Sequence, residues 1–285
     1  MTSNQIKSIV KIIVFVAFIV ILYNECLIYY SSYFSWPEHH MKRSSSLNEN
    51  EREVRLLLVA DPQLIGEEDE PWHYSWIARW DSDRYLHNTY MLAHSYVKPD
   101  VVVFMGDLFD EGLKASDEQY DRYFTRFKRI FRLGSTNALK DGMSVSAHDR
   151  TRYVFMSGDN DVGGEYLGDR NDKLGDRFEK YFGSMMNLLD LNDYLRIAKL
   201  DLDYTVSFYN SMKRNAMREL IAELDGKRSE LESENRNKYL LIYNHMTLLR
   251  RDNQELEYVR GRSSQCVIRY FFLVGLILES FKYFF

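Results

Sequence analysis

The first thirty residues carry an apolar run with almost no polar interruption. Residues 9–23 are apolar apart from Lys11, and residues 12–30 have close to the roughly 20 positions that cross a bilayer as a helix. Lys7 and Lys11 precede the run, which favours a cytosolic N-terminus. The pattern predicts a membrane-spanning helix that is retained as a signal-anchor. A cleaved signal peptide and a buried helix of a soluble protein are the alternatives, although no small-residue cleavage site follows the run.

Beyond residue 53, short apolar runs alternate with segments of helical spacing. The apolar runs, which are typical of strands covered on both faces of a sheet, lie at residues 54–60, 101–105, 153–156 and 239–243. Helical spacing is found at residues 81–97, 116–133, 172–182 and 212–234, and residues 203–208 alternate like a further strand. Ser116 followed by Gln119 predicts a capped helix start. The alternation predicts an α/β domain with crossovers between strands.

Each of the four long apolar runs ends in a side chain that can bind a metal ion. Asp61 follows the first run, Asp107 the second, Asp159 the third and His245 the fourth. A turn needs only one such residue for its own hydrogen bonds. Because ligands gather at the carboxyl ends of strands in open α/β sheets, we expect these side chains to share one site.

Two amide side chains add to this predicted site. Gln63 lies two residues after Asp61, and Asn160 directly follows Asp159. Oxygen ligands combined with an imidazole suit manganese, iron or zinc better than calcium. Two such ions about 3.5 to 4 Å apart can clamp a phosphoryl group and activate water. The pattern therefore predicts a centre of two divalent ions, with manganese expected first and iron or zinc as alternatives.

Composition narrows the classes of function. The net charge of −5 gives no basic face for nucleic acid, so no nucleic-acid partner is expected. The two cysteines, Cys26 and Cys266, form neither a disulfide framework nor a zinc motif. Trp72, Trp76 and Trp80 recur at intervals of four, which indicates packing or a membrane-proximal surface, with a wall of a substrate cleft as the alternative.

The ordered motifs "DPQ", "GDLFDEG", "GDND" and "YNHM" resemble those of the calcineurin-like metallophosphoesterases. The subgroup that "ADPQLIGE", "VVVFMGDLFDEG" and the N-terminal anchor most resemble is the membrane-anchored phosphoesterase of GPI-anchor remodelling. The resemblance implies a layered αββα sandwich. It also implies a luminal enzyme that removes ethanolamine-phosphate from the GPI glycan.

The resemblance also implies a role for each site residue. Asp61 would bind the first metal, Asp107 would bridge both, and His245 would bind the second. Asp159 stands where the family has a metal-binding Asn, and Gln63 stands where many members have a His ligand. Asn160 occupies the position of the family's general-acid His, and an amide supplies no proton at neutral pH. Asp161 would support the site by stabilising its loop.

The end of the chain departs from the family pattern. The family's G-H-x-H motif is missing, since no histidine occurs in residues 246–285. Residues 270–278 form an apolar stretch that is too short to cross a bilayer, and no further strand is expected there. We therefore expect a phosphoesterase domain truncated at its C-terminus. The alternative is a tail that forms a short hydrophobic helix or lies on the membrane.

These observations divide the chain into five segments. They are a cytosolic N-terminus (1–8), a transmembrane signal-anchor (9–30), a linker (31–53), an incomplete metallophosphoesterase domain (54–250) and an atypical tail (251–285). The expected partners are the lipid bilayer and a GPI-anchored protein substrate. The expected location is the membrane of the endoplasmic reticulum or Golgi, where the enzyme would support transport of GPI-anchored proteins. The alternative function is a catalytically inactive, membrane-anchored scaffold or binding protein.

Overall fold

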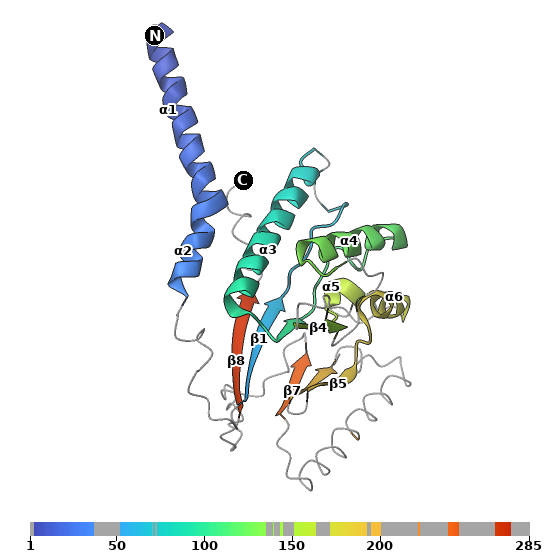
Figure 1. The fold of residues 1–285 in the computed structure, drawn as a ribbon. Coiled ribbons are helices and arrows are strands. Elements are labelled where there is room, and N and C mark those ends of the chain that lie inside the picture. Colours follow the sequence, from blue (N-terminus) through green and yellow to red (C-terminus); the bar gives the residue numbers. More distant parts are fainter. Residues whose placement is uncertain are drawn as a thin grey trace, which may run out of the picture.

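A computed structural model describes most of the N-terminal two thirds of the chain and two later strands. The described residues are 3–36, 52–69, 71, 73–134, 139, 143–144, 151–163, 172–192, 195–200, 222, 239–244 and 266–274. Figure 1 shows a long helical rod beside a layered body of strands and helices.

The rod consists of three continuous helical elements, α1 (Ser3–Leu22), the π-helical turn η1 (Tyr23–Leu27) and α2 (Ile28–Ser35). No residue of α1 is buried, and the helix is long and apolar enough to cross a membrane. A signal sequence near an N-terminus has the same length and composition. The predicted apolar helix is therefore present, and either a span or a signal sequence fits it.

The central sheet has five strands in the order β3-β4-β2-β1-β8. These strands are β1 (Arg52–Ala60), β2 (Val101–Phe104), β3 (Met143–Ser144), β4 (Arg152–Phe155) and β8 (Cys266–Val274). β1, β2, β4 and β8 run parallel, and β3 pairs antiparallel with β4. In the register, Leu56 lies opposite Val101, and Val101 lies opposite Arg152. The carboxyl ends of β1, β2 and β4 consequently meet at one edge of the sheet.

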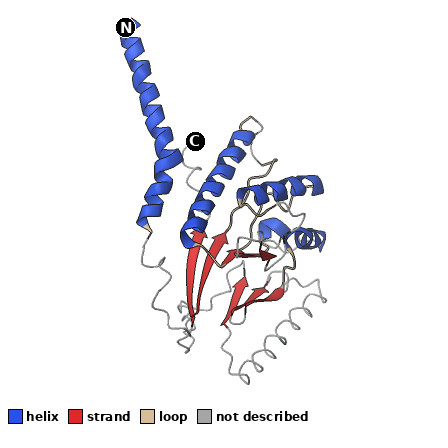
Figure 2. Cartoon of the chain, viewed as in Figure 1, coloured by secondary structure: helices blue, strands red, loops and turns tan. Residues whose placement is uncertain are grey.

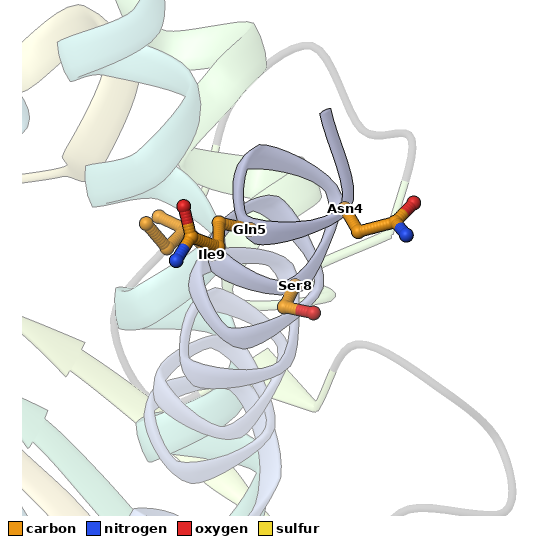
Figure 3. A pocket seen from close by; sticks show the side chains of 4 residues that line it. All are labelled: Asn4, Gln5, Ser8 and Ile9. Atoms are coloured by element: carbon orange, nitrogen blue, oxygen red, sulfur yellow. The ribbon is translucent and has the colours of Figure 1, made fainter. Parts of the chain in front are cut away.

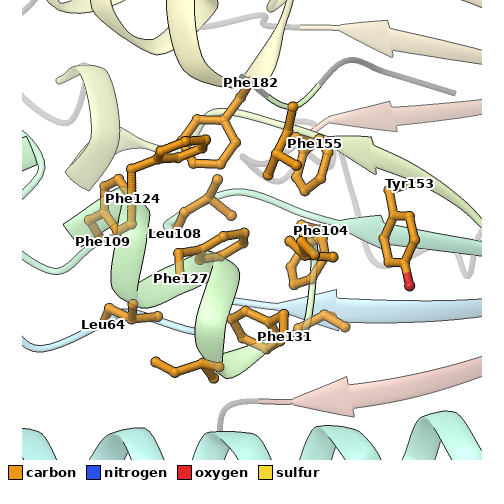
Figure 4. Packing of buried hydrophobic residues seen from close by; sticks show 14 of the residues in the cluster. Leu64, Phe104, Leu108, Phe109, Phe124, Phe127, Phe131, Tyr153, Phe155 and Phe182 are labelled. Atoms are coloured by element: carbon orange, nitrogen blue, oxygen red, sulfur yellow. The ribbon is translucent and has the colours of Figure 1, made fainter. Parts of the chain in front are cut away.

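Helices cover one face of this sheet (Figure 2). They are α3 (Ser75–Val97), α4 (Asp117–Ile130) and α6 (Asp172–Phe182), with the single turn α5 (Asp159–Val162) between β4 and α6. Their buried side chains pack with alternate residues of the strands around a phenylalanine-rich core, which Figure 4 shows. Phe104 is central to that core, because its ring stacks on Phe155 at 5.4 Å and contacts Phe127 at 5.1 Å.

The other face of the sheet packs against a second sheet. This sheet has the order β5-β6-β7 and consists of β5 (Asn187–Asn192), β6 (Leu195–Leu200) and β7 (Tyr239–Asn244). Leu56 and Leu58 of β1 share a core cluster with Ile197 of β6, with Leu189 of β5 packed against it. β1, β2 and β4 are thus buried on both faces, which explains their uninterrupted apolar runs.

Several predicted elements are confirmed. The strands predicted at 54–60, 101–105, 153–156 and 239–243 and the helix at 172–182 lie where expected, within one or two residues. The start of α4 carries the predicted capping box, with Ser116 Oγ accepting from Gln119 N and Gln119 Oε1 accepting from Ser116 N. The parallel sheet and helices fit the predicted α/β class. The strand predicted at 203–208 lies outside the described residues, as does all of the helix predicted at 212–234 except residue 222.

β7, the strand that precedes His245, belongs to the second sheet and pairs parallel with β6. One expectation about the sheets is wrong. A strand does follow residue 250, because β8 pairs parallel with β1 along all nine of its residues. An apolar run of this length fits a strand as well as a helix, and only its pairing with β1 separates the two. The domain boundaries, including the one at residue 250, stay predictions.

Candidate functional site

The loops after β1 and β2 run side by side beyond the edge of the sheet. Gln63 N donates to Asp107 O at 2.9 Å, and Leu64 N donates to Leu108 O at 3.1 Å. Asp110 N donates back to Leu64 O at 3.1 Å. These bonds hold the two polar strand ends in one register, and they place Gln63 beside Asp107.

The backbone is strained at three of the predicted ligands. Asp61, Gln63 and Asp107 have φ values of 46°, 38° and 49°, and Gly106 has a φ of 102°. Residues with a Cβ atom rarely adopt this left-handed region, which costs on the order of 1 to 3 kcal/mol each. Such strain persists where the surrounding structure enforces it and clusters at functional sites. The outliers therefore mark the strand ends as a candidate site.

The Asp107 carboxylate is the centre of this site. It is 6% exposed, and its Oδ1 accepts from Asn160 N at 3.0 Å. Its Oδ2 accepts from Asn160 Nδ2 at 3.1 Å and from Gln63 Nε2 at 3.2 Å. The ends of β1, β2 and β4 thus each contribute one polar side chain to a single point.

Gly158 permits this convergence. A Cβ atom at Gly158 would lie 2.1 Å from Asp107 Oδ1 and 2.3 Å from Asp107 N. Its own φ of −119° is an ordinary extended value. The glycine at the end of β4 is therefore needed for close approach and not for its conformational freedom.

Asp161 connects the loops that follow β2 and β4 through its carboxylate. Its carboxylate is 1% exposed and accepts hydrogen bonds from Leu108 N, Phe109 N and Gly158 N. Burial, and after it the negative charge of Asp107, raises the pKa of Asp161 to about 7, although the three N–H donors act in the opposite direction. The raised pKa thus reflects a carboxylate that is buried close to a second carboxylate.

Glu111 is a further site residue that sequence reasoning missed. It is 1% exposed, and its carboxylate accepts from Glu67 N, Glu68 N and Asp69 N at 2.7 to 3.1 Å. The Tyr123 hydroxyl also donates to it at 3.1 Å. Burial raises the pKa of the Tyr123 phenol, and the charge of Glu111 adds to the rise, so that the hydroxyl remains a donor. The only signal in the sequence was a second acid before the glycine of "GDLFDEG".

The other predicted ligands are Asp61, Asp159 and His245. Asp61 is exposed directly after β1, and Asp159 is half-buried as the first residue of α5. His245 lies outside the described residues. Within the described part of the chain, no group of three or more His, Cys, Asp or Glu side chains is arranged to hold a metal ion. The amides of Gln63 and Asn160 both donate to the Asp107 carboxylate.

The histidines His73 and His87 lie on or near α3. His87 lies on α3, and its Nδ1 is 2.6 Å from the carbonyl oxygen of Ile130 in α4. This contact gives His87 a structural partner between two helices. His73 is exposed and packs edge-on against Tyr74 before α3.

A pocket also lies beside the first turns of α1 (Figure 3). It is lined by Asn4, Gln5, Ser8 and Ile9, which all belong to that one helix. It therefore has no relation to the strand ends and no grouping of catalytic side chains.

The chain is similar to several proteins named Metallophosphoesterase 1 or Metallophosphoesterase 1 homolog. Metallophosphoesterase 1 of Pongo abelii is 31% identical over 174 residues, which are 59% of this chain and 38% of that protein. The Metallophosphoesterase 1 homologs of Drosophila melanogaster and Caenorhabditis elegans are 28% and 24% identical over 56% and 55% of this chain. These similarities support a metallophosphoesterase relationship. No protein-family model matches the chain, and it spans well under half the length of these relatives.

Proposed function

We propose that the chain is a metal-dependent phosphoesterase whose centre is Asp107. The observation that carries this proposal is the convergence of Gln63, Asp107 and Asn160 at three parallel strand ends, two of them on left-handed backbone. The similarity to proteins named Metallophosphoesterase 1 supports a phosphoesterase-type hydrolase.

The donor chemistry of this edge fits divalent cations. The side chains that would hold two such ions are those of Asp61, Gln63, Asp107, Asp159 and His245. The amide oxygen of Gln63 would become a ligand after the amide rotates away from its present bond to Asp107. Bound cations would supply positive charge that stabilises the phosphoryl group in the transition state. Asp161 and Glu111 would keep the loops in place around them.

The proposed substrate is a phosphodiester carried on a membrane, namely the ethanolamine-phosphate of a GPI anchor. This choice rests on the resemblance of the motifs and on the apolar helix α1 that precedes the domain. The proposed location is the endoplasmic reticulum or Golgi membrane, with the domain in the lumen. There the reaction would assist export of GPI-anchored proteins.

One observation favours a second function, an inactive membrane-anchored scaffold. The Asp107 carboxylate already accepts three N–H bonds from Asn160 and Gln63, and these bonds provide part of the compensation that cations would give. Asn160 also offers no proton for a leaving alkoxide. Such a protein would keep the fold and bind a partner without hydrolysis.

A histidine in place of Asn160 tests whether the general acid is missing. Asn160→His is expected to raise the hydrolysis rate by about 10²-fold, since general-acid catalysis contributes about 10² to 10⁴. The rate should then fall as the pH rises through about 6.5, because only the protonated imidazole can donate. Steady-state rates across pH measure this, with Asn160→Ala as the control. A histidine variant no faster than the alanine variant would argue against an acid at this position.

The proposed function itself is tested by metal content and hydrolysis in the full chain in lipid nanodiscs. We expect bound manganese, iron or zinc in the parent by mass spectrometry, together with turnover of bis(p-nitrophenyl) phosphate. Asp107→Asn should lose the metal and reduce turnover by about 10²-fold or more, comparable to removing one preorganised charge-stabilising group. The control is Asp117→Asn, which changes an exposed acid at the start of α4. A folded parent without metal or turnover would instead support the scaffold.

A further inference from the structure

The first turns of α3 expose a cluster of large apolar side chains. Trp76 and Trp80 are 63% and 61% exposed, and Tyr74 and Ile77 are also exposed. We call Tyr74, Trp76, Ile77 and Trp80 the aromatic patch. Single exposed apolar residues are normal, but a contiguous group of this kind marks an interaction surface.

Contacts with the helical rod set the orientation of α3. Glu25 forms an ion pair with Arg84, the ring of Tyr29 contacts Tyr85 at 5.8 Å, and that of Tyr33 contacts Tyr96 at 5.3 Å. The contacts advance in the same direction along both helices, so η1 and α2 run parallel to α3. The start of α3 therefore lies at the end of the domain from which α1 projects, and in Figure 1 the two helices diverge toward that end.

The helical rise places the patch at the level of the apolar helix. Trp80 precedes Arg84 by four residues and Trp76 by eight, which correspond to about 6 and 12 Å along the axis. Leu22, the last residue of α1, lies about 5 Å beyond Glu25 on the same scale. The patch thus lies about level with Leu22, the C-terminal end of α1.

The chemistry of the patch suits the boundary between lipid and water. Tryptophan and tyrosine are enriched at this boundary, where the ring is apolar and its N–H or O–H remains wet. The nearby charges have partners within the protein. Arg79 donates to the carbonyl oxygen of Gly66, and Arg84 pairs with Asp81 and lies 5.3 Å from the centre of the Trp80 ring.

We propose that the aromatic patch docks into the interface of the bilayer that α1 crosses, as a second membrane contact of this chain. The proposal rests on α1 being inserted and is independent of any hydrolytic activity. It has a consequence for the candidate site. Because α3 returns antiparallel to β1, its first turn lies at the carboxyl end of β1, where Asp61 and Gln63 follow. The candidate site and the patch therefore lie at the same end of the domain.

Tryptophan fluorescence of the full chain in phosphatidylcholine vesicles tests this docking. The chain has four tryptophans, Trp36, Trp72, Trp76 and Trp80. The patch variant, Trp36→Phe with Trp72→Phe, keeps only Trp76 and Trp80. The matched control, in which Trp72, Trp76 and Trp80 are replaced by Phe, keeps only Trp36. Trp36 packs on Tyr96 at 4.7 Å, eleven residues beyond Glu25 and away from the apolar run.

Lipids brominated near the headgroup end of the acyl chain should lower the emission of the patch variant about twofold, as expected for side chains about 5 to 10 Å into the boundary. The Trp36 control should lose little emission, and both variants should float with the vesicles. Equal quenching in the two variants, or no flotation, would overturn the proposal. Protection of the patch from aqueous acrylamide without quenching by brominated lipid would also overturn it, because a second copy of the chain would then be the occupant.

Discussion

Gly158→Ala is expected to destabilise the folded chain by about 3 kcal/mol or more, at the upper end of the range for overpacking. The added Cβ would lie 2.1 Å from Asp107 Oδ1 and 2.3 Å from Asp107 N, and the second of these atoms belongs to the backbone. A flexible side chain could rotate away, but a backbone nitrogen cannot move without displacing the loop after β2. The end of β4 and the Asp107 loop must therefore separate.

Thermal unfolding of the full chain in detergent measures this effect. A loss of about 3 kcal/mol corresponds to a fall in Tm of about 6 to 12 °C for a chain of this size. Gly134→Ala is the control, because Gly134 is exposed and has a φ of 75°. There the cost arises from backbone conformation alone, at about 1 to 2 kcal/mol. If Gly158→Ala cost less than Gly134→Ala, the close packing of Gly158 against Asp107 would be wrong.

The Gly158 variant also links stability to the site. Separation of the two loops would break the bonds from Asn160 to both oxygens of Asp107. We therefore expect any metal binding or phosphodiesterase activity of the parent to fall together with the Tm. Full activity in a destabilised Gly158→Ala chain would show that Asp107 and Asn160 need not be in contact.

Glu111→Gln is expected to cost about 3 kcal/mol, because it disturbs a buried, hydrogen-bonded carboxylate. Three consecutive N–H groups, from Glu67 to Asp69, donate to Glu111, and an amide in its place would turn a donor toward some of them. The carboxylate also lies directly against Gly66, where an added Cβ atom would be 1.9 Å from Glu111 Oε2. The loop after β1 should then lose its fixed path.

Hydrogen exchange together with thermal unfolding measures the loss at Glu111. The amides of residues 67–69 should exchange faster in Glu111→Gln than in the parent, and the Tm should fall by about 6 to 12 °C. Glu118→Gln is the control, because Glu118 is exposed in the first turn of α4, and substitutions of this type stay within about 0.5 kcal/mol. Unchanged exchange at residues 67–69 would contradict a carboxylate that organises this loop.

Local patterns allowed much of the fold to be predicted from the sequence. The strands after residue 53 were found because burial on both faces requires an unbroken apolar run, and this requirement is visible over a few residues. The start of α4 was found because Ser116 and Gln119 satisfy each other's backbone within one turn. The polar residues that converge at the candidate site were partly found, since parallel strands bring their carboxyl ends to one edge.

Other features of the site needed contacts between distant residues. The partners of Asp107 are 44 and 53 residues away, and the bonds that Glu111 accepts from the loop after β1 span 42 to 44 residues. No pattern within a short stretch of sequence indicates which N–H groups will donate to a given carboxylate. The orientation of the Gln63 and Asn160 amides toward Asp107 is one such case, and the left-handed backbone at Asp61, Gln63 and Asp107 is another.

The sequence by itself determined the apolar helix, the apolar strands and the polar residues that end them, because each depends on neighbours within about one or two turns of chain. The tertiary structure alone decided that β7 joins the second sheet and that β8 pairs with β1. It also decided that the carboxylates of Glu111 and Asp161 accept hydrogen bonds from backbone N–H groups. The position of the aromatic patch relative to α1 is a further feature that only the tertiary structure decided. These features depend on pairing and packing between segments that are far apart in the chain. Several arrangements of those segments satisfy the same local pattern, and burial of apolar surface across the whole domain selects one of them.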